Sequence, residues 1–208
     1  INKLDLPSEY ERFMLNVEAI ADLESAGYEW VGLDHFAKQS DEMVEWKAQH
    51  RLNRGFIGYT CEYENLLGIG PSALSSFGKY FAQNTYGLSD YCSALDRSTF
   101  PIFRGYECSS DILIRRKIIS ELINYSFLGF SDIENEFGIE FFSYFASELE
   151  SMDEFIKDDL MELTESSIKV TAEGKYFVRH ICMIFDVFLR EKNMHKPSSR
   201  KDSKMVVS

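Results

Sequence analysis

The sequence predicts an α/β arrangement in its first part and a mostly helical second part. Near the start of the chain, a capped helix runs directly into a short apolar strand, which is one αβ unit of a parallel sheet or barrel. From about residue 88 the apolar residues recur at helical intervals and few strand patterns remain. We therefore expect one part over residues 1–87 and a helical part over 88–190. Residues 191–208 lack periodicity, which predicts a disordered tail.

The first elements have recognisable boundaries. Ser8 and Glu11 have the spacing of a capping box, and Gly27 follows the apolar helical pattern as a stop. The next stretch, "YEWVGLDHFA", is short, aromatic and branched, and it predicts one strand ending near Asp34. Residues 40–50 predict a short polar helix.

The second part predicts three further units. "SSDILIRRKIISELINYSF" predicts a helix that starts near Asp111, and "IEFFSYFASELESMDEFI" predicts a second helix. "LMELTESSIKVTAEGKYFVRHICMIFDVFLR" predicts a strand, a turn, a second strand and a long helix. Helices followed by a small hairpin and a closing helix are typical of a winged-helix shape.

Composition and charge restrict the possible partners. The chain has 34 acidic and 22 basic residues and a net charge of −12, which argues against a general nucleic-acid binder. No apolar run approaches the roughly 20 residues that a membrane helix needs. We therefore expect neither nucleic acid nor membrane as a partner. The chain opens at Ile1, so we also expect it to be the C-terminal part of a longer protein.

The cysteines are scattered along the chain. The spacing of Cys61, Cys92, Cys108 and Cys182 matches neither a zinc site nor an iron–sulfur motif. The spacing predicts free thiols in a reducing cytoplasm and no metal centre built from this chain alone.

A glycine-rich stretch, "LNRGFIGYTCEYENLLGIGPSALS", covers residues 52–75. Clustered glycines indicate a bent backbone or its close approach to another group. Neither the GxGxxG nor the GxxxxGK[ST] pattern can be read here, so these residues do not predict a phosphate loop.

The glycine-rich stretch contains two of seven motifs that occur in a fixed order along the chain. They are "GLDHFAKQSDEM", "LNRGFIGYT", "LLGIGPSALS", "FAQN", "FRG", "IRR" and "VTAEGKYFVRHICMIFDVFLR". Together they resemble the C-terminal part of the oxygen-independent coproporphyrinogen III oxidases, which are radical S-adenosylmethionine (SAM) enzymes of haem biosynthesis. The resemblance runs from about Tyr10 to Arg190. Related haem chaperones share the barrel but match "DHFA" and the pattern Arg-x-Phe-x-Gly-Tyr-Thr less well.

The resemblance implies a cytoplasmic, monomeric oxidoreductase that uses SAM and a 4Fe–4S cluster. Its substrate would be coproporphyrinogen III, two of whose propionates become vinyl groups to give protoporphyrinogen IX. The implied fold is the last part of a radical-SAM (β/α) partial barrel followed by a winged-helix-like domain. The family holds its cluster on a CxxxCxxC loop, and this sequence contains no such motif. The chain alone is therefore not expected to perform the reaction.

The resemblance also implies particular site residues. It places Phe56, Ile57 and Leu74 at the second of two SAM molecules in each active site. Ile57 stands where the family pattern has glutamine, and Leu74 stands where it has isoleucine. The alternative is that Phe56 and Leu74 only pack in the core. Arg54 and Arg51, beside the glycine segment, are candidates to bind the propionates because arginine forks suit carboxylates.

Other roles remain open for some residues and for the whole chain. Asp34 and His35 end a barrel-like strand, where parallel barrels carry their chemistry, but a loop or cap role is the alternative. Arg115 and Arg116 are expected to form ion pairs on a helix face. No catalytic residue or metal ligand is assigned. The alternative functions are a related radical-SAM haem chaperone and a non-enzymatic winged-helix binding module.

Overall fold

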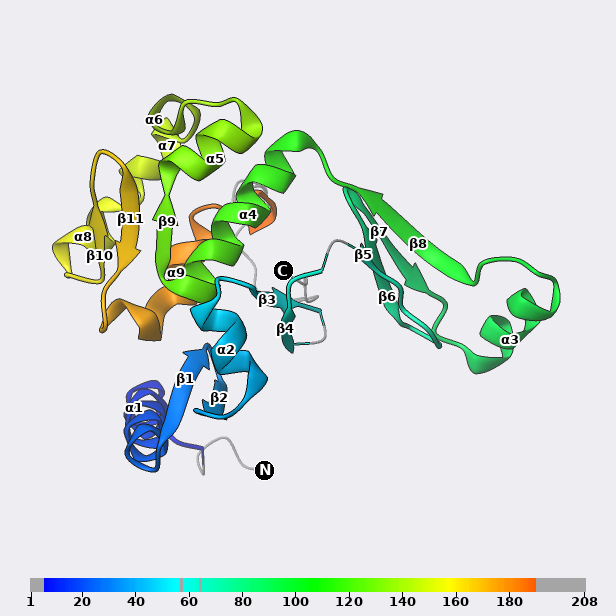
Figure 1. Cartoon of the computed structure of the whole chain (residues 1–208), viewed down its shortest axis with the longest axis horizontal. Helices are drawn as coiled ribbons and strands as arrows, with labels where there is room; N and C mark the ends of the chain where they lie inside the picture. The colour runs from blue at the N-terminus through cyan, green and yellow to red at the C-terminus, as the bar shows by residue number, and fades with distance from the viewer. Residues whose placement is uncertain (1–5, 57, 64, 190–208) are drawn as a thin grey trace.

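The computed structural model describes residues 6–56, 58–63 and 65–189. Figure 1 shows two parts: an arm that extends to one side, and a body that holds the remaining elements. The arm comprises residues 65–107 and contains one sheet and one helix. The predicted tail over 191–208 and the predicted site residue Ile57 lie outside the described residues.

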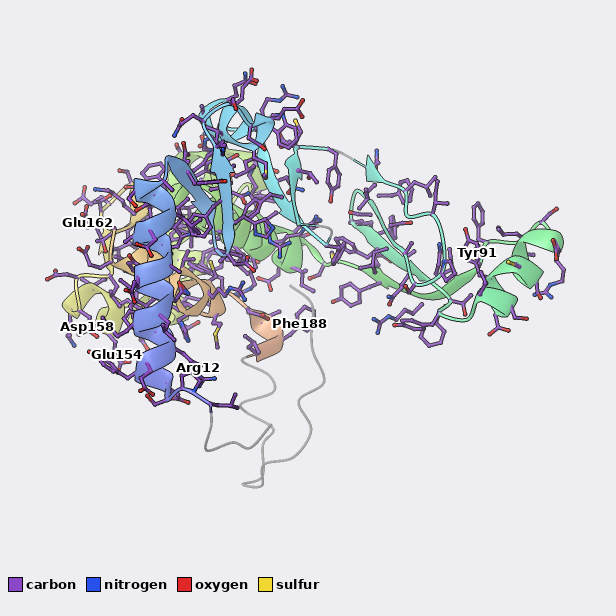
Figure 2. The ribbon with its side chains drawn as sticks, turned by 90° about the horizontal axis from the view of Figure 1, so that it is seen from below. Arg12, Tyr91, Glu154, Asp158, Glu162 and Phe188 are labelled. Carbon is purple, nitrogen blue, oxygen red and sulfur yellow. The ribbon has the colours of Figure 1, made fainter. Side chains whose placement is uncertain are left out.

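Helix α1 (Glu9–Ser25) begins as the sequence predicts. The Ser8 hydroxyl accepts from the Glu11 backbone N–H at 3.2 Å, and the Glu11 carboxylate accepts from the Ser8 N–H at 2.8 Å. Gly27, with φ +84°, follows the helix end. Figure 2 shows α1 along the outside of the body with Arg12 near one end. Ile20 is its only buried residue, so α1 contributes little to the core.

The next element is a hairpin, and the prediction of one strand in a parallel unit is wrong here. β1 (Tyr28–Gly32) pairs antiparallel with β2 (His35–Lys38). The chain reverses because Leu33 adopts a left-handed φ of +49°, and a bulge precedes it. Helix α2 (Glu42–Ala48) follows, with the Asp41 side chain accepting from the Met43 N–H at 2.9 Å.

A second hairpin consists of β3 (Leu52–Gly55) and β4 (Gly58–Cys61). It packs on the first hairpin through a small core of buried residues, which are Val31, Ala37, Leu52 and Tyr59.

The arm is a four-stranded antiparallel sheet in the order β5-β6-β7-β8. Its elements are β5 (Asn65–Leu66), β6 (Leu74–Phe77), β7 (Tyr80–Asn84), α3 (Leu88–Asp96) and β8 (Ile102–Glu107). The predicted division between residues 87 and 88 falls inside this sheet, because β8 pairs with β7. The sequence pattern did not reveal β8, whose residues are all exposed and therefore lack an apolar alternation.

The rest of the body starts with α4 (Ser110–Tyr125), which matches the predicted helix. The elements after it are β9 (Phe127–Gly129), α5 (Phe130–Phe137), α6 (Phe141–Tyr144), α7 (Ala146–Glu150), α8 (Asp153–Lys157), β10 (Met161–Leu163), β11 (Ser167–Val170), the 3₁₀ helix η2 (Gly174–Phe177) and α9 (Val178–Met183). β9, β10 and β11 form an antiparallel sheet in the order β10-β11-β9. The fold is thus mixed helix and sheet, and every strand pair among the described residues is antiparallel.

Two predicted helices are broken. The stretch predicted as one helix around Phe145 and Met152 forms α6, α7 and α8 instead. Both residues lie at the breaks and have no exposed surface, so the chain turns there to place them in the core. The predicted long closing helix ends at Met183, just before Phe185, which is also fully buried.

The main core lies between α4, the β9–β11 sheet and the later helices. Its fully buried side chains include Ile118, Leu122, Phe141, Phe145, Met152, Ile168, Ile181 and Phe185. Over the described ranges, no helix combines the length and apolar character needed to cross a membrane.

Candidate functional site

The β3–β4 hairpin carries most of the residues that the sequence singled out. Arg54 pairs with Tyr59, and Gly55 with Gly58, so Phe56 lies at the turn. The base of the hairpin is fixed to α4, because the Leu52 carbonyl accepts from the Asn124 amide at 3.1 Å and from the Tyr125 hydroxyl at 2.9 Å. These two bonds hold the hairpin turn in a defined position relative to the body.

Phe56 faces the arm. Its ring meets Phe81 of β7 edge-on, with ring centroids 5.6 Å apart. The Arg116 guanidinium of α4 lies 4.7 Å from the centroid of the same Phe81 ring. Leu74 belongs to β6, the strand that neighbours β7. Phe56 and Phe81 therefore mark the corner where the hairpin meets the arm, and Leu74 pairs with Gln83, two residues further along β7 than Phe81.

The hairpin also holds most of the buried polar atoms that have no hydrogen-bond partner in the described structure. The described residues contain four such side-chain atoms, and three of them belong to the hairpin: Arg54 Nε, Tyr59 Oη and Thr60 Oγ1. A buried polar group without a partner costs about 1–3 kcal/mol. Their concentration on one hairpin indicates that other groups complete this region in the working protein.

The glycines have a structural explanation in the chain itself. A Cβ on Gly68 would lie 2.3 Å from the Leu74 carbonyl oxygen, so only glycine allows these two backbone segments to approach. Gly58 has a φ of +110°, which side-chain-bearing residues rarely adopt. Gly70 donates its N–H to the hydroxyl of Tyr91, a residue of α3 on the arm (Figure 2), at 3.0 Å.

The two arginine candidates are separated. Arg54 is half-buried; it donates to the Gly55 carbonyl and lies 5.6 Å from the Tyr59 ring centroid. Arg51 is exposed and precedes β3, at the opposite end of the hairpin from Phe56. Residues three apart in a strand lie about 10 Å from each other, so the side chains of Arg51 and Arg54 extend from separate points on the chain.

Asp34, in the β1–β2 turn, and His35, the first residue of β2, lie next to the β3–β4 hairpin. Asp34 Oδ1 is 2.9 Å from His35 Nδ1, and the His35 ring meets the Tyr59 ring edge-on at 4.9 Å. Burial raises the pKa of Asp34, but its own backbone N–H, His35 and Arg179 outweigh burial and lower that pKa overall. Burial also raises the pKa of Tyr59 above its ordinary value.

The residues described here do not fit an iron–sulfur cluster. All four cysteines are free, and no group of three His, Cys, Asp or Glu side chains in the described part could hold a metal ion. The aromatic face of Phe56 and the unpartnered donor of Arg54 suit part of an organic ligand with polar groups.

Sequence reasoning missed some of the residues that the fold brings here. Phe81, Arg116 and Arg179 each lie within one of the seven motifs, but nothing in those motifs indicates that the fold brings them close to the hairpin or to the residues around it. Tyr59 belongs to the Gly-Tyr-Thr pattern, but that pattern does not indicate that its hydroxyl is buried and has no partner among the described residues.

Comparisons with known proteins give the chain its relatives. It is 39% identical over 197 residues to the oxygen-independent coproporphyrinogen III oxidase of Pseudomonas aeruginosa, covering 94% of this chain and 43% of the relative. It is 37% identical over 201 residues to the protein of the same name from Escherichia coli, covering 96% and 44%. No protein-family model matches the chain.

A solved structure agrees. The coproporphyrinogen III oxidase of Escherichia coli, described as a radical SAM enzyme, superposes with a TM-score of 0.84 at 38% identity. The match covers 90% of this chain and 44% of the other. The resemblance predicted from the motifs is therefore confirmed, and the chain spans less than half the length of these homologues.

Proposed function

We propose that this chain is part of an oxygen-independent coproporphyrinogen III oxidase. The whole enzyme would decarboxylate two propionates of coproporphyrinogen III to vinyl groups and form protoporphyrinogen IX. The observation that carries the proposal is the match to a radical SAM coproporphyrinogen III oxidase, with a TM-score of 0.84 and 38% identity over 90% of the chain. Agreement in sequence and backbone together is much stronger support than either alone.

The chemistry requires groups that this chain does not carry. A 4Fe–4S cluster and SAM supply the radical that starts the reaction in such enzymes. The cluster would be held by residues outside this chain, because its four free cysteines form no cluster of ligands among the described residues. The role of this chain is accordingly to bind and orient organic ligands.

The β3–β4 hairpin is the part that we assign to SAM. Phe56 would offer an aromatic face and Leu74 an aliphatic wall, and Ile57 stands in the sequence at the position of the family's glutamine. The corner between hairpin and arm, where Phe56 meets Phe81, supports this assignment. The binding of two SAM molecules in each active site is part of the proposal.

Architecture, location and assembly also remain proposals. We assign residues from α4 onward to a winged-helix-like domain. The order α4, β9, α5 to α8, β10, β11, with β9 joining β11, supports this assignment. Free cysteines support a reducing compartment such as the cytoplasm, and we expect a monomer without nucleic-acid or membrane partners.

An anaerobic assay of the complete protein tests the function. With its cluster reconstituted and with SAM and a reductant present, it should convert coproporphyrinogen III to protoporphyrinogen IX, measured by chromatography after oxidation to the porphyrins. Haem binding without turnover of coproporphyrinogen III would favour the chaperone alternative and contradict the proposal.

A further inference from the structure

Four polar side chains from three separate parts of the chain lie at or near one buried tyrosine. His35 and Arg54 contact its ring, Asp34 contacts His35, and Arg179 lies against Asp34. Tyr59 is 8% exposed, and its ring is contacted edge-on by His35, the first residue of β2. The Arg54 guanidinium approaches the same ring from β3, with its Cζ 5.6 Å from the centroid. Arg179 from α9 approaches through Asp34, with Nη2 3.9 Å from Oδ1.

This cluster concentrates positive charge in an acidic chain. The chain as a whole carries a net charge of −12. The cluster brings two arginines and a histidine together with one contacting carboxylate, that of Asp34. A surplus of cationic donors at one place attracts an anion, and arginine forks match carboxylate geometry in particular.

Two features show that the cluster has capacity for a ligand. Arg54 Nε is buried and has no hydrogen-bond partner in the described structure, so one charged donor is left to be satisfied. His35 Nδ1 lies within hydrogen-bond distance of Asp34 Oδ1. The other ring nitrogen, Nε2, faces the hairpin, since a Cβ built on Gly58 would lie 3.7 Å from Nε2. Asp34 therefore fixes the ring so that Nε2 remains available.

We propose that His35, Arg54 and Arg179 bind a propionate carboxylate of the substrate, and that Asp34 is a positioning residue for His35. This inference rests on the proposed function and specifies how part of the substrate is recognised. Coproporphyrinogen III has four carboxylates, so its binding site needs several such cationic groups. The cluster lies beside the hairpin that carries Phe56, so the substrate would lie next to the assigned cofactor.

Binding of coproporphyrin III, an air-stable form of the substrate ring, to the complete protein tests the proposal by fluorescence. Arg179→Gln, His35→Gln and Arg54→Gln should each weaken the dissociation constant by about tenfold, the value expected for one lost charged hydrogen bond. Arg97→Gln is the matched control: it removes an exposed arginine at the end of α3, on the outer arm in Figure 1, and should leave binding unchanged.

The role of Asp34 needs a separate measurement. Asp34→Asn should weaken porphyrin binding several-fold in the unmodified background, but not in a protein that already carries His35→Gln. Such non-additivity distinguishes positioning from an independent contact. Melting temperatures of all variants identify loss of folding, and Arg54→Lys, which keeps the charge, supplies a second test if Arg54→Gln unfolds.

The binding measurements distinguish failure of the proposed function from failure of the carboxylate site alone. If the unmodified protein binds no coproporphyrin III, the proposed function fails. If it binds and the folded variants bind equally well, the carboxylate site fails while the proposed function stands. Weakened SAM binding with unchanged porphyrin binding would also overturn the assignment to the substrate.

Discussion

The Arg115 guanidinium donates to the carboxylate of Glu148 at 2.8 Å, and the Glu148 side chain is only 1% exposed. Arg115 also pairs with Asp111 at 2.9 Å and lies 5.2 Å from the Phe145 ring centroid. The network joins α4 to α7 across the main core. Arg115 therefore has its expected ion pairs, while its neighbour Arg116 lies against Phe81 of the arm.

Arg115→Leu should destabilise the protein by about 3–5 kcal/mol, because it leaves the buried Glu148 carboxylate without its arginine. Thermal and urea unfolding measure the change. Arg116→Leu, an exposed neighbour on the same helix, is the control and should cost about 1 kcal/mol or less. Equal effects of the two substitutions would contradict a structural role specific to Arg115.

Gly32→Ala should destabilise the fold by about 1–3 kcal/mol, because its Cβ would lie 2.4 Å from the Tyr59 hydroxyl. Tyr59→Phe removes a buried hydroxyl that has no protein partner among the described residues, so its own effect should be near zero or stabilising. In the double variant, loss of the hydroxyl should recover part of the Gly32→Ala cost. A Tyr59→Phe cost above about 2 kcal/mol would instead reveal a partner for the hydroxyl.

The cysteines should differ in reactivity. Burial raises the pKa of the Cys182 thiol to about 12 and also raises the pKa of Cys108, whereas Cys92 is exposed. Because the thiolate is the reactive form, alkylation of the native protein near pH 8 should label Cys92 first. Mass spectrometry of the peptides gives the order. Early labelling of Cys182 would mean that α9 opens readily in solution.

Asp34 should contribute a pH-dependent stabilisation. Its folded-state pKa is lowered from 3.8, so the contribution is present above that value and is lost as pH falls through the folded pKa. Because 70% of the Asp34 side chain is exposed, the effect should be small. Asp34→Asn should lower the melting temperature at about pH 5, with the difference shrinking below about pH 4. A difference that grows in acid would contradict this sign.

Phe56→Ala in the complete enzyme should weaken binding of one SAM by about ten- to a hundredfold, since an aromatic surface contributes roughly 1–3 kcal/mol. Phe103→Ala removes an arm aromatic that is 61% exposed and is the control. Equilibrium dialysis gives the stoichiometry, and a melting curve reports folding. A loss of about 3–5 kcal/mol of stability with loss of all SAM binding would indicate a core role instead.

Elements whose causes are local could be predicted from the order of the amino acids. The capping box of Ser8 and Glu11 fixes the start of α1, because both partners lie within one helical turn. The apolar stripe of Ile114, Ile118 and Leu122 likewise predicted α4, since all three face the core one turn apart. The ordered motifs also identified the family, which depends on residue identity and spacing alone.

The position of the first chain reversal and the group of side chains around Tyr59 depend on long-range packing instead. The left-handed turn at Leu33, a residue that disfavours that conformation, is imposed by packing of the β1–β2 hairpin and has no local signal. β8 is exposed throughout, and only its pairing with β7 defines it. Arg179 reaches Asp34 from a helix about 145 residues further along the chain, a juxtaposition that depends on long-range packing and that no sequence periodicity encodes.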